Sequence, residues 1–251
     1  MRLGGLLAPL GDSAVDPQGL ANHCRAFEDS GFDSIWIPQA LGRGFMFSDP
    51  FVALTVAATV TNLEIGTAVV QLPLYDMPDL AHRMASLTQL APDRFVFGVG
   101  AGSTEADFRL LDRQYSERFL DYDQRIRELR QWRDAGQYLN RDLNVWPHLI
   151  GKPPILMGTW GKNVEIAARE YDGWIASGTY RTSDEILRSL KTYRAFGGTR
   201  AIVSTIQVGP ETDIELLSRQ LKKYEESGID DAILMPLNGS PPLEKLRNLV
   251  Q

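Results

Sequence analysis

The sequence predicts an α/β protein that folds as a single (β/α)8 barrel over residues 1–251. Its 251 residues suit one such barrel, and 43% of them are hydrophobic, enough for a large core. Short apolar runs alternate with amphipathic helical patterns, and eight such runs are found, most of them followed by a helix. No low-complexity segment or linker divides the chain. The count of runs and the length together favour a closed barrel over an open doubly wound sheet.

The most clearly patterned part of the chain is a βαβ unit between Asn62 and Glu105. An apolar run, Leu63–Val70, is followed by helically spaced apolar residues and then by a second run, Arg94–Gly100. The helical positions are Leu80, Met84, Leu87 and Leu90. Both runs are almost continuously apolar, which is typical of parallel strands buried on both faces. Small residues close each run, and they allow a ligand to approach the backbone closely.

The other elements continue this alternation. The remaining strands are expected at Leu3–Pro9, Phe32–Pro38, Pro153–Gly158, Tyr171–Gly178, Arg200–Val208 and Asp231–Pro236. Helices are expected at Pro17–Ser30, Pro50–Thr61, Val164–Glu170, Thr182–Tyr193, Glu211–Ser227 and Pro242–Val250. A further helix should bury Phe119, Tyr122, Ile126, Leu129 and Trp132 on one face. The stretch Glu105–Tyr115 fits a short helix or an irregular loop, and Gln137–Lys152 follows neither period.

Composition narrows the classes of function. The net charge is −6 and the basic residues are scattered, which disfavours binding to nucleic acids or membrane surfaces. The only cysteine, Cys24, falls on the inner face of the first helix, so a buried, inert thiol is expected and no disulfide can form within the chain. This fits the reducing cytoplasm. The apolar run at the N-terminus is too short to span a membrane and has no clear cleavage site.

Active sites of (β/α)8 barrels lie at the carboxyl ends of the strands, so these ends predict the site. None of the three histidines falls at a clear strand end, and no metal-binding motif, carboxylate pair or Ser-His-Asp pattern is visible there. The ends instead carry glycine, alanine, threonine and aromatic residues, which suit a large, flat cofactor. Two of them, Gly158–Gly161 and Ser177–Thr179, lead into helices whose N-termini attract phosphate, although glycine before a helix is also ordinary turn chemistry.

Four stretches together resemble one known family. They are the segment from Leu63 to Gly102 and the motifs GFDSIWIP, PPILMGTWG and YDGWIASG. They stand in the order found in the bacterial luciferase-like flavin-dependent oxidoreductases, and the resemblance covers most of the chain from Leu3 to Gly178. It implies a (β/α)8 barrel that binds FMN or a deazaflavin coenzyme at the carboxyl ends of its strands.

The resemblance also implies roles for particular residues of this chain. It places a non-proline cis peptide bond at Ala68–Val69, behind the flavin ring. It lets the ring and the ribityl chain pass along Gly100, Ala101 and Gly102. The residues that it places around the phosphate are Gly158, Thr159, Trp160, Gly161, Ser177 and Gly178.

The sequence departs from the family after its second strand. Many members have an acidic residue and a histidine there, whereas this chain has Gln39 and Ala40. Tyr75, just beyond the third strand, is the best candidate for a catalytic proton donor, with Gln39 as a hydrogen-bonding partner. Arg43, in the loop after the second strand, is expected either to bind an anionic substrate or to be solvated.

These observations lead to one functional hypothesis and two alternatives. The first is a flavin-dependent oxidoreductase, more specifically a monooxygenase that uses reduced FMN and oxygen on a small organic substrate, with a separate flavin reductase as partner. The alternatives are a deazaflavin-dependent hydride transferase and a flavin-binding subunit without catalytic activity. The missing acidic residue and histidine are the reason for placing FMN first. A homodimer is expected because dimers are common in the family, and no metal, nucleic acid or membrane is expected as a ligand or partner.

Overall fold

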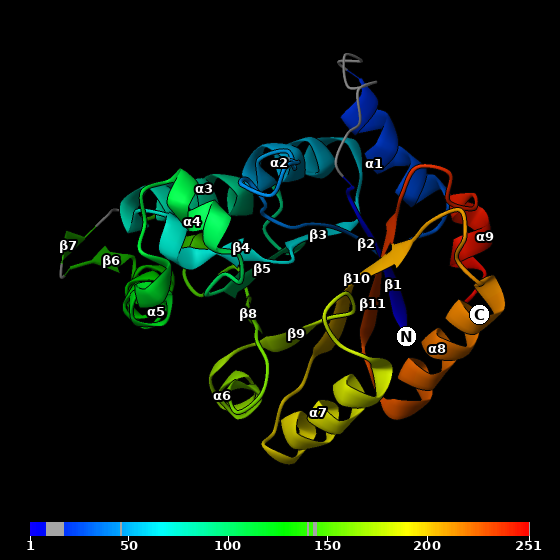
Figure 1. Ribbon diagram of the computed structural model, residues 1–251. Coiled ribbons are helices and arrows are strands. Elements are labelled where there is room, and N and C mark those ends of the chain that lie inside the picture. The colour runs from blue at the N-terminus through cyan, green and yellow to red at the C-terminus, as the bar shows by residue number, and fades with distance from the viewer. Residues whose placement is uncertain (9–17, 46, 140, 143–144, 251) are drawn as a thin grey trace.

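The computed structural model describes residues 1–8, 18–45, 47–139, 141–142 and 145–250, and its ribbon is shown in Figure 1. Eight parallel strands close into a barrel. In the order in which they pair, they are β1 Arg2–Leu6, β2 Ser34–Ile37, β3 Glu64–Thr67, β5 Phe95–Gly100, β8 Ile155–Gly158, β9 Gly173–Ser177, β10 Ala201–Val208 and β11 Asp231–Pro236. Strand β11 pairs with β1 and closes the ring, which confirms the expected (β/α)8 barrel. The short strand β4 Val70–Gln71 follows β3 and pairs with β5.

Helices surround the barrel, as Figure 1 shows. They are α1 Gly19–Asp29, α2 Pro50–Val60, α3 Met77–Leu90, α4 Glu105–Leu110, α5 Arg118–Ala135, α6 Asn163–Glu170, α7 Ser183–Ala195, α8 Ile214–Ser227 and α9 Leu243–Arg247. Helix α2 begins at the expected Pro50. The Asp49 carboxylate accepts hydrogen bonds from the N–H groups of Phe51 and Val52, and Pro50 has no N–H that would need an acceptor. The expected end of the first strand at Pro9 and the expected start of the first helix at Pro17 lie outside the described residues.

The barrel interior is built from large side chains placed against glycines. Trp36 of β2 is fully buried, and its indole N–H donates to Ser34 Oγ at 2.8 Å. A Cβ added at Gly66 of β3 would lie 2.3 Å from the Trp36 ring, and one at Gly4 of β1 would lie 3.0 Å from it. The ring therefore fills the space that side chains at both neighbouring strands would need.

Four charged residues close the amino-terminal end of the barrel. Arg2, Glu64 and Asp231 stand at the first positions of β1, β3 and β11, and Arg200 directly precedes β10. The Arg200 guanidinium lies 2.6 Å from Glu64 and 2.9 Å from Asp231, while Arg2 lies 3.1 Å from Glu64. Because Asp231 is buried, these arginines compensate a charge that water cannot reach.

One expectation about the helices needs correction, one unassigned stretch is now described, and the expectation for Cys24 is confirmed. Phe119 was expected on the buried face but is 52% exposed. It lies in the first turn of α5, where its ring packs against the Arg118 guanidinium, 4.2 Å from the ring centroid, and not against the core. The four other residues of that face are buried as expected. The unassigned stretch after α5 contains a small antiparallel pair, β6 Gln137–Tyr138 and β7 Arg141–Asp142. Cys24 is buried as expected, and burial raises the pKa of its thiol to about 11.

Candidate functional site

Val69, which follows β3, packs against the carboxyl ends of β5 and β8. The peptide bond between Ala68 and Val69 is cis, as the resemblance implied. A Cβ added at Gly100, at the end of β5, would lie 2.9 Å from Val69 Cγ2, and one added at Gly158, at the end of β8, would lie 2.7 Å from Val69 Cγ1. Glycine is needed at both positions because the Val69 side chain fills the space of their missing side chains.

The chain leaves β5 close to a buried acceptor. Ala101 is half-buried against the core, and Gly102 has a φ of +86°. A Cβ added at Gly102 would lie 2.6 Å from the Phe108 ring and 2.7 Å from Gln71 Oε1. Gln71 Oε1 is buried and has no hydrogen-bond partner among the described residues. A buried acceptor without a donor is uncommon in proteins, so a donor from a bound ligand or water fits this position.

Gln39 and Tyr75, the two predicted catalytic residues, are hydrogen-bonded to each other. Gln39 Nε2 donates to Tyr75 Oη at 3.1 Å, and Gln39 Oε1 accepts from the Gln71 main-chain N–H at 2.8 Å. The main-chain N–H of Gln39 donates to the Val69 carbonyl at 3.2 Å, which joins the pair to the cis peptide. Burial raises the pKa of Tyr75, and the nearby Asp49 carboxylate raises it further, so the phenol stays protonated at neutral pH.

Sequence reasoning missed Asp107, a fully buried carboxylate in the first turn of α4. Its Oδ1 accepts from the main-chain N–H groups of Leu41, at 3.3 Å, and Gly42, at 2.9 Å. Its Oδ2 accepts from Arg43 Nε at 3.0 Å, from Arg43 Nη2 at 2.7 Å and from Gln71 Nε2 at 2.7 Å. Burial by itself would raise the pKa of Asp107, but the hydrogen bonds from Arg43, Gly42 and Gln71 outweigh it and lower this pKa below its ordinary value.

The structure pairs Arg43 with Asp107, whereas the sequence suggested that Arg43 binds an anionic substrate or is solvated. Its side chain is 22% exposed and is held by Asp107, so it is neither free in solvent nor an uncommitted anion ligand. The two residues lie 64 positions apart. An aspartate in the first turn of a helix is ordinarily explained by the helix dipole, and no local pattern signals that this one is buried.

The loop Gly158–Gly161 leads into α6, whose N-terminus is available to an anion. No side chain in the described part of the chain caps this helix. Gly161 has a φ of +65°, and no atom lies within 4 Å of the place where its Cβ would stand. Thr159 is anchored through its carbonyl, which accepts from Trp174 Nε1 at 3.0 Å. Uncapped N–H groups at a helix start are suited to phosphate.

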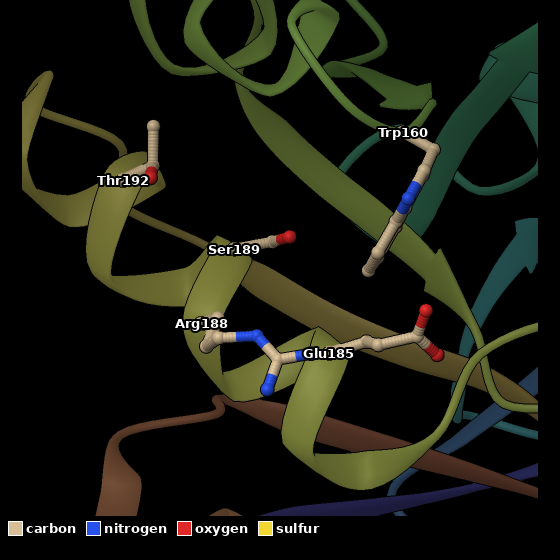
Figure 2. A pocket seen from close by; sticks show the side chains of 5 residues that line it. All are labelled: Trp160, Glu185, Arg188, Ser189 and Thr192. Atoms are coloured by element: carbon tan, nitrogen blue, oxygen red, sulfur yellow. The ribbon is translucent and has the colours of Figure 1, made fainter.

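Trp160, in the same loop, faces helix α7 (Figure 2). With four residues of α7 it lines a hollow of about 270 Å³; these are Glu185, Arg188, Ser189 and Thr192. The Arg181 guanidinium lies 4.6 Å from the centroid of the Trp160 ring. The ring therefore belongs to the α7 side of the loop, and its contact with a cofactor stays a prediction.

The second phosphate candidate, Ser177–Gly178, is less available. The main-chain N–H of Gly178 already donates to the Ser204 carbonyl at 2.7 Å. Helix α7, which follows, is capped by its own residues: Thr182 Oγ1 accepts from the Glu185 N–H, and the Glu185 carboxylate accepts from the Thr182 N–H. The capping pattern is visible in the sequence and could have separated the two candidates. The geometry favours α6 over α7 as the anion site.

Two classes of site find no support in the described residues. Within them, no three His, Cys, Asp or Glu side chains are placed to hold a metal ion. In the same ranges, no helix is both long and apolar enough to cross a membrane.

Comparison with known proteins identifies the family. Residues 3–234 match the luciferase-like monooxygenases. The chain belongs to this family. The match includes the carboxyl ends of β3, β5, β8 and β9, where the candidate site residues lie.

Relatives of the chain include monooxygenases and an F420-dependent dehydrogenase. The chain is 30% identical to 4-hydroxyprotoasukamycin monooxygenase of Streptomyces nodosus subsp. asukaensis over 43% of its length, a match that spans 31% of that relative. It is 29% identical to F420-dependent glucose-6-phosphate dehydrogenase of Kineococcus radiotolerans over 64% of its length, which spans 52% of that relative. Among solved structures, monooxygenase RslO1 of Streptomyces bottropensis has the same fold, with a TM-score of 0.81 at 15% identity, covering 99% of this chain and 96% of that one.

Proposed function

We propose that this protein is a monooxygenase that uses reduced FMN and oxygen on a small organic substrate. One observation carries the proposal: the described polar groups around Gln39 offer hydrogen bonds but no free titratable base. Gln39 cannot ionise, the raised pKa keeps Tyr75 protonated, and Asp107 is paired with Arg43. A site of this kind can orient and polarise a ligand, while the redox chemistry comes from a cofactor.

The described residues fit a flavin at this site. The uncapped N-terminus of α6, which follows Gly161 closely, would hold the phosphate, and Gln71 Oε1 is a buried acceptor that has no donor among the described residues. When bound, reduced FMN supplies the electrons and reacts with oxygen. The protein's own residues have other tasks: Tyr75 would donate a hydrogen bond from Oη to an acceptor oxygen of the ligand, and Gln39 would hold Tyr75 in place.

A deazaflavin-dependent hydride transferase is the second candidate. It is supported by the similarity to the F420-dependent dehydrogenase of Kineococcus radiotolerans, which extends over 64% of the chain. Gln39 and Ala40 count against it, because they stand where the family resemblance places an acidic residue and a histidine. A flavin-binding subunit without activity would have the same fold and would differ only in turnover.

Titrations with FMN and with coenzyme F420, followed by visible absorption and fluorescence, test the proposal first. Micromolar binding of FMN without binding of F420, followed by substrate-dependent oxygen consumption with reduced FMN, is the expected result. Tight binding of F420 alone would move the protein to the hydride transferases. FMN binding without turnover on any substrate of a broad panel would support the inactive subunit, and binding of neither would refute the cofactor site.

The proposed reaction has consequences for partners. The proposed reaction uses FMN that has already been reduced, and we infer a separate flavin reductase as its source. We also infer a homodimer. Light scattering on the purified chain tests the dimer, and oxygen consumption with and without an added NADH-dependent flavin reductase tests the supply of reduced FMN.

A further inference from the structure

Asp107 is connected to Gln39 from two directions. On one side it accepts hydrogen bonds from the main chain of Leu41 and Gly42, which follow Gln39 closely in the sequence. On the other side it accepts from Gln71 Nε2, and the same amide group lies 3.4 Å from the Gln39 carbonyl oxygen. Gln39 and Gln71 are only 8% and 2% exposed, so water has little access to either amide. The position of residue 39 therefore depends on the Asp107 carboxylate.

The direction of each hydrogen bond in this chain of contacts is determined by groups that can only donate or can only accept. An ionised carboxylate only accepts, so Gln71 must turn its NH2 group toward Asp107. A main-chain N–H only donates, so Gln39 must turn its Oε1 toward Gln71 and its NH2 group toward Tyr75. Tyr75 Oη is thus an acceptor in this contact. Its own proton has no acceptor among the described residues and is left for a ligand.

We propose that Asp107 is a positioning residue that holds Gln39 with its NH2 group on Tyr75 Oη, so that the Tyr75 proton is offered to an acceptor oxygen, a carbonyl or an oxyanion, of the bound ligand. The identity of that ligand rests on the proposed function, but the orientation of Tyr75 does not. Without the carboxylate, Leu41, Gly42 and Gln71 lose a shared acceptor, and residue 39 can move away from the Gln71 main-chain N–H that fixes its amide. The Gln39 amide can then rotate, and the Tyr75 hydroxyl can donate to its oxygen instead. The ligand would lose its hydrogen bond although Tyr75 itself is unchanged.

Fluorine NMR of the apoprotein labelled with 3-fluorotyrosine tests this orientation, because the resonance responds to hydrogen bonding of the phenol. Tyr75→Phe assigns the Tyr75 resonance by its loss. Gln39→Glu provides the reference for a Tyr75 that donates, since a carboxylate at residue 39 can only accept. Asp107→Asn is expected to move the Tyr75 resonance toward this reference position. Asp231→Asn is the matched control: it removes another buried carboxylate paired with arginine, at the opposite end of the barrel, and should leave the resonance in place.

Gln71→Met provides a second test that keeps Asp107 and the main-chain N–H at position 71. It removes the side-chain link, and it should move the Tyr75 resonance in the same direction as Asp107→Asn. If Asp107→Asn does not fold, Gln71→Met decides the question alone. A Tyr75 resonance that stays at its wild-type position in the folded variants would overturn the proposal. Since no flavin or substrate is added, a failure of the proposed function leaves this test valid.

Discussion

Replacing Asp107 by asparagine should destabilise the protein by an amount that the geometry allows us to estimate. The substitution keeps the shape of the side chain but removes its charge, and it puts an NH2 group among donors from Arg43, Gln71 and the main chain. Removing one partner of a buried ion pair costs about 3–5 kcal/mol. Because the Arg43 side chain is 22% exposed and can be partly hydrated, we expect the lower end of this range, about 3 kcal/mol.

Thermal unfolding followed by far-UV circular dichroism measures this change. For a protein of this size, each kcal/mol corresponds to about 2–4 °C in Tm, so the variant should melt about 6–12 °C below wild type at neutral pH. The difference should shrink in acid. The pKa of Asp107 is lower in the folded state than its ordinary value of 3.8, so its stabilisation is present above that value and is lost as the pH falls through the folded-state pKa. Asparagine has no proton to gain there.

An exposed aspartate provides the control. Asp184 lies 2.6 Å from Lys223 in an ion pair on the surface, and Asp184→Asn should leave the Tm unchanged because water and salt screen such pairs. Our reasoning would be refuted if the Asp107 and Asp184 variants melted at the same temperature. It would also fail if the gap between Asp107→Asn and wild type persisted unchanged into acid, since the carboxylate charge could then not be its cause.

Three further substitutions test other parts of the molecule. Gly158→Ala places a methyl group 2.7 Å from Val69 Cγ1, and the resulting shift of Val69 should weaken FMN binding, measured by fluorescence titration, at least about tenfold. Tyr75→Phe removes one hydroxyl, so turnover should fall by roughly 10²-fold. This ratio of wild-type to variant turnover should be the same at neutral and at mildly alkaline pH, because burial raises the pKa of the phenol and keeps it protonated. Arg200→Met leaves the buried Asp231 without the arginine closest to it, so unfolding followed by circular dichroism should show a loss of about 3 kcal/mol, with unchanged FMN affinity.

Each of these three predictions can be contradicted by a specific result. Gly209→Ala adds a methyl group where no atom lies within 4 Å, so it should not change FMN affinity; equal affinities for the Gly209 and Gly158 variants would remove Val69 from the site. Full turnover by Tyr75→Phe would exclude its hydroxyl from the reaction. A large loss of FMN binding in Arg200→Met would show that the two ends of the barrel are coupled.

Elements with a strong local pattern could be predicted from the sequence. The runs at β3 and β5 and the helix between them follow from periodicity alone, and the start of α2 follows from Asp49 and Pro50. The sequence also predicted a candidate site at one rim, because the strands of a parallel barrel all end there. The cis bond between Ala68 and Val69 was expected from family resemblance and is present.

The tertiary structure decided which polar groups at that rim act together. Arg43 lies in the loop after β2, Gln71 in β4 and Asp107 in the first turn of α4, and only closure of the barrel brings them within hydrogen-bond distance. The tertiary structure also decided the burial of Phe119. Its spacing in the sequence matches the inner face of α5, but its helical turn lies beyond the core. A sequence pattern records which face of an element is apolar, because that depends on neighbours three or four positions away. It does not record which distant loops meet, and at this rim that meeting determines which carboxylate is buried and which hydroxyl proton is free.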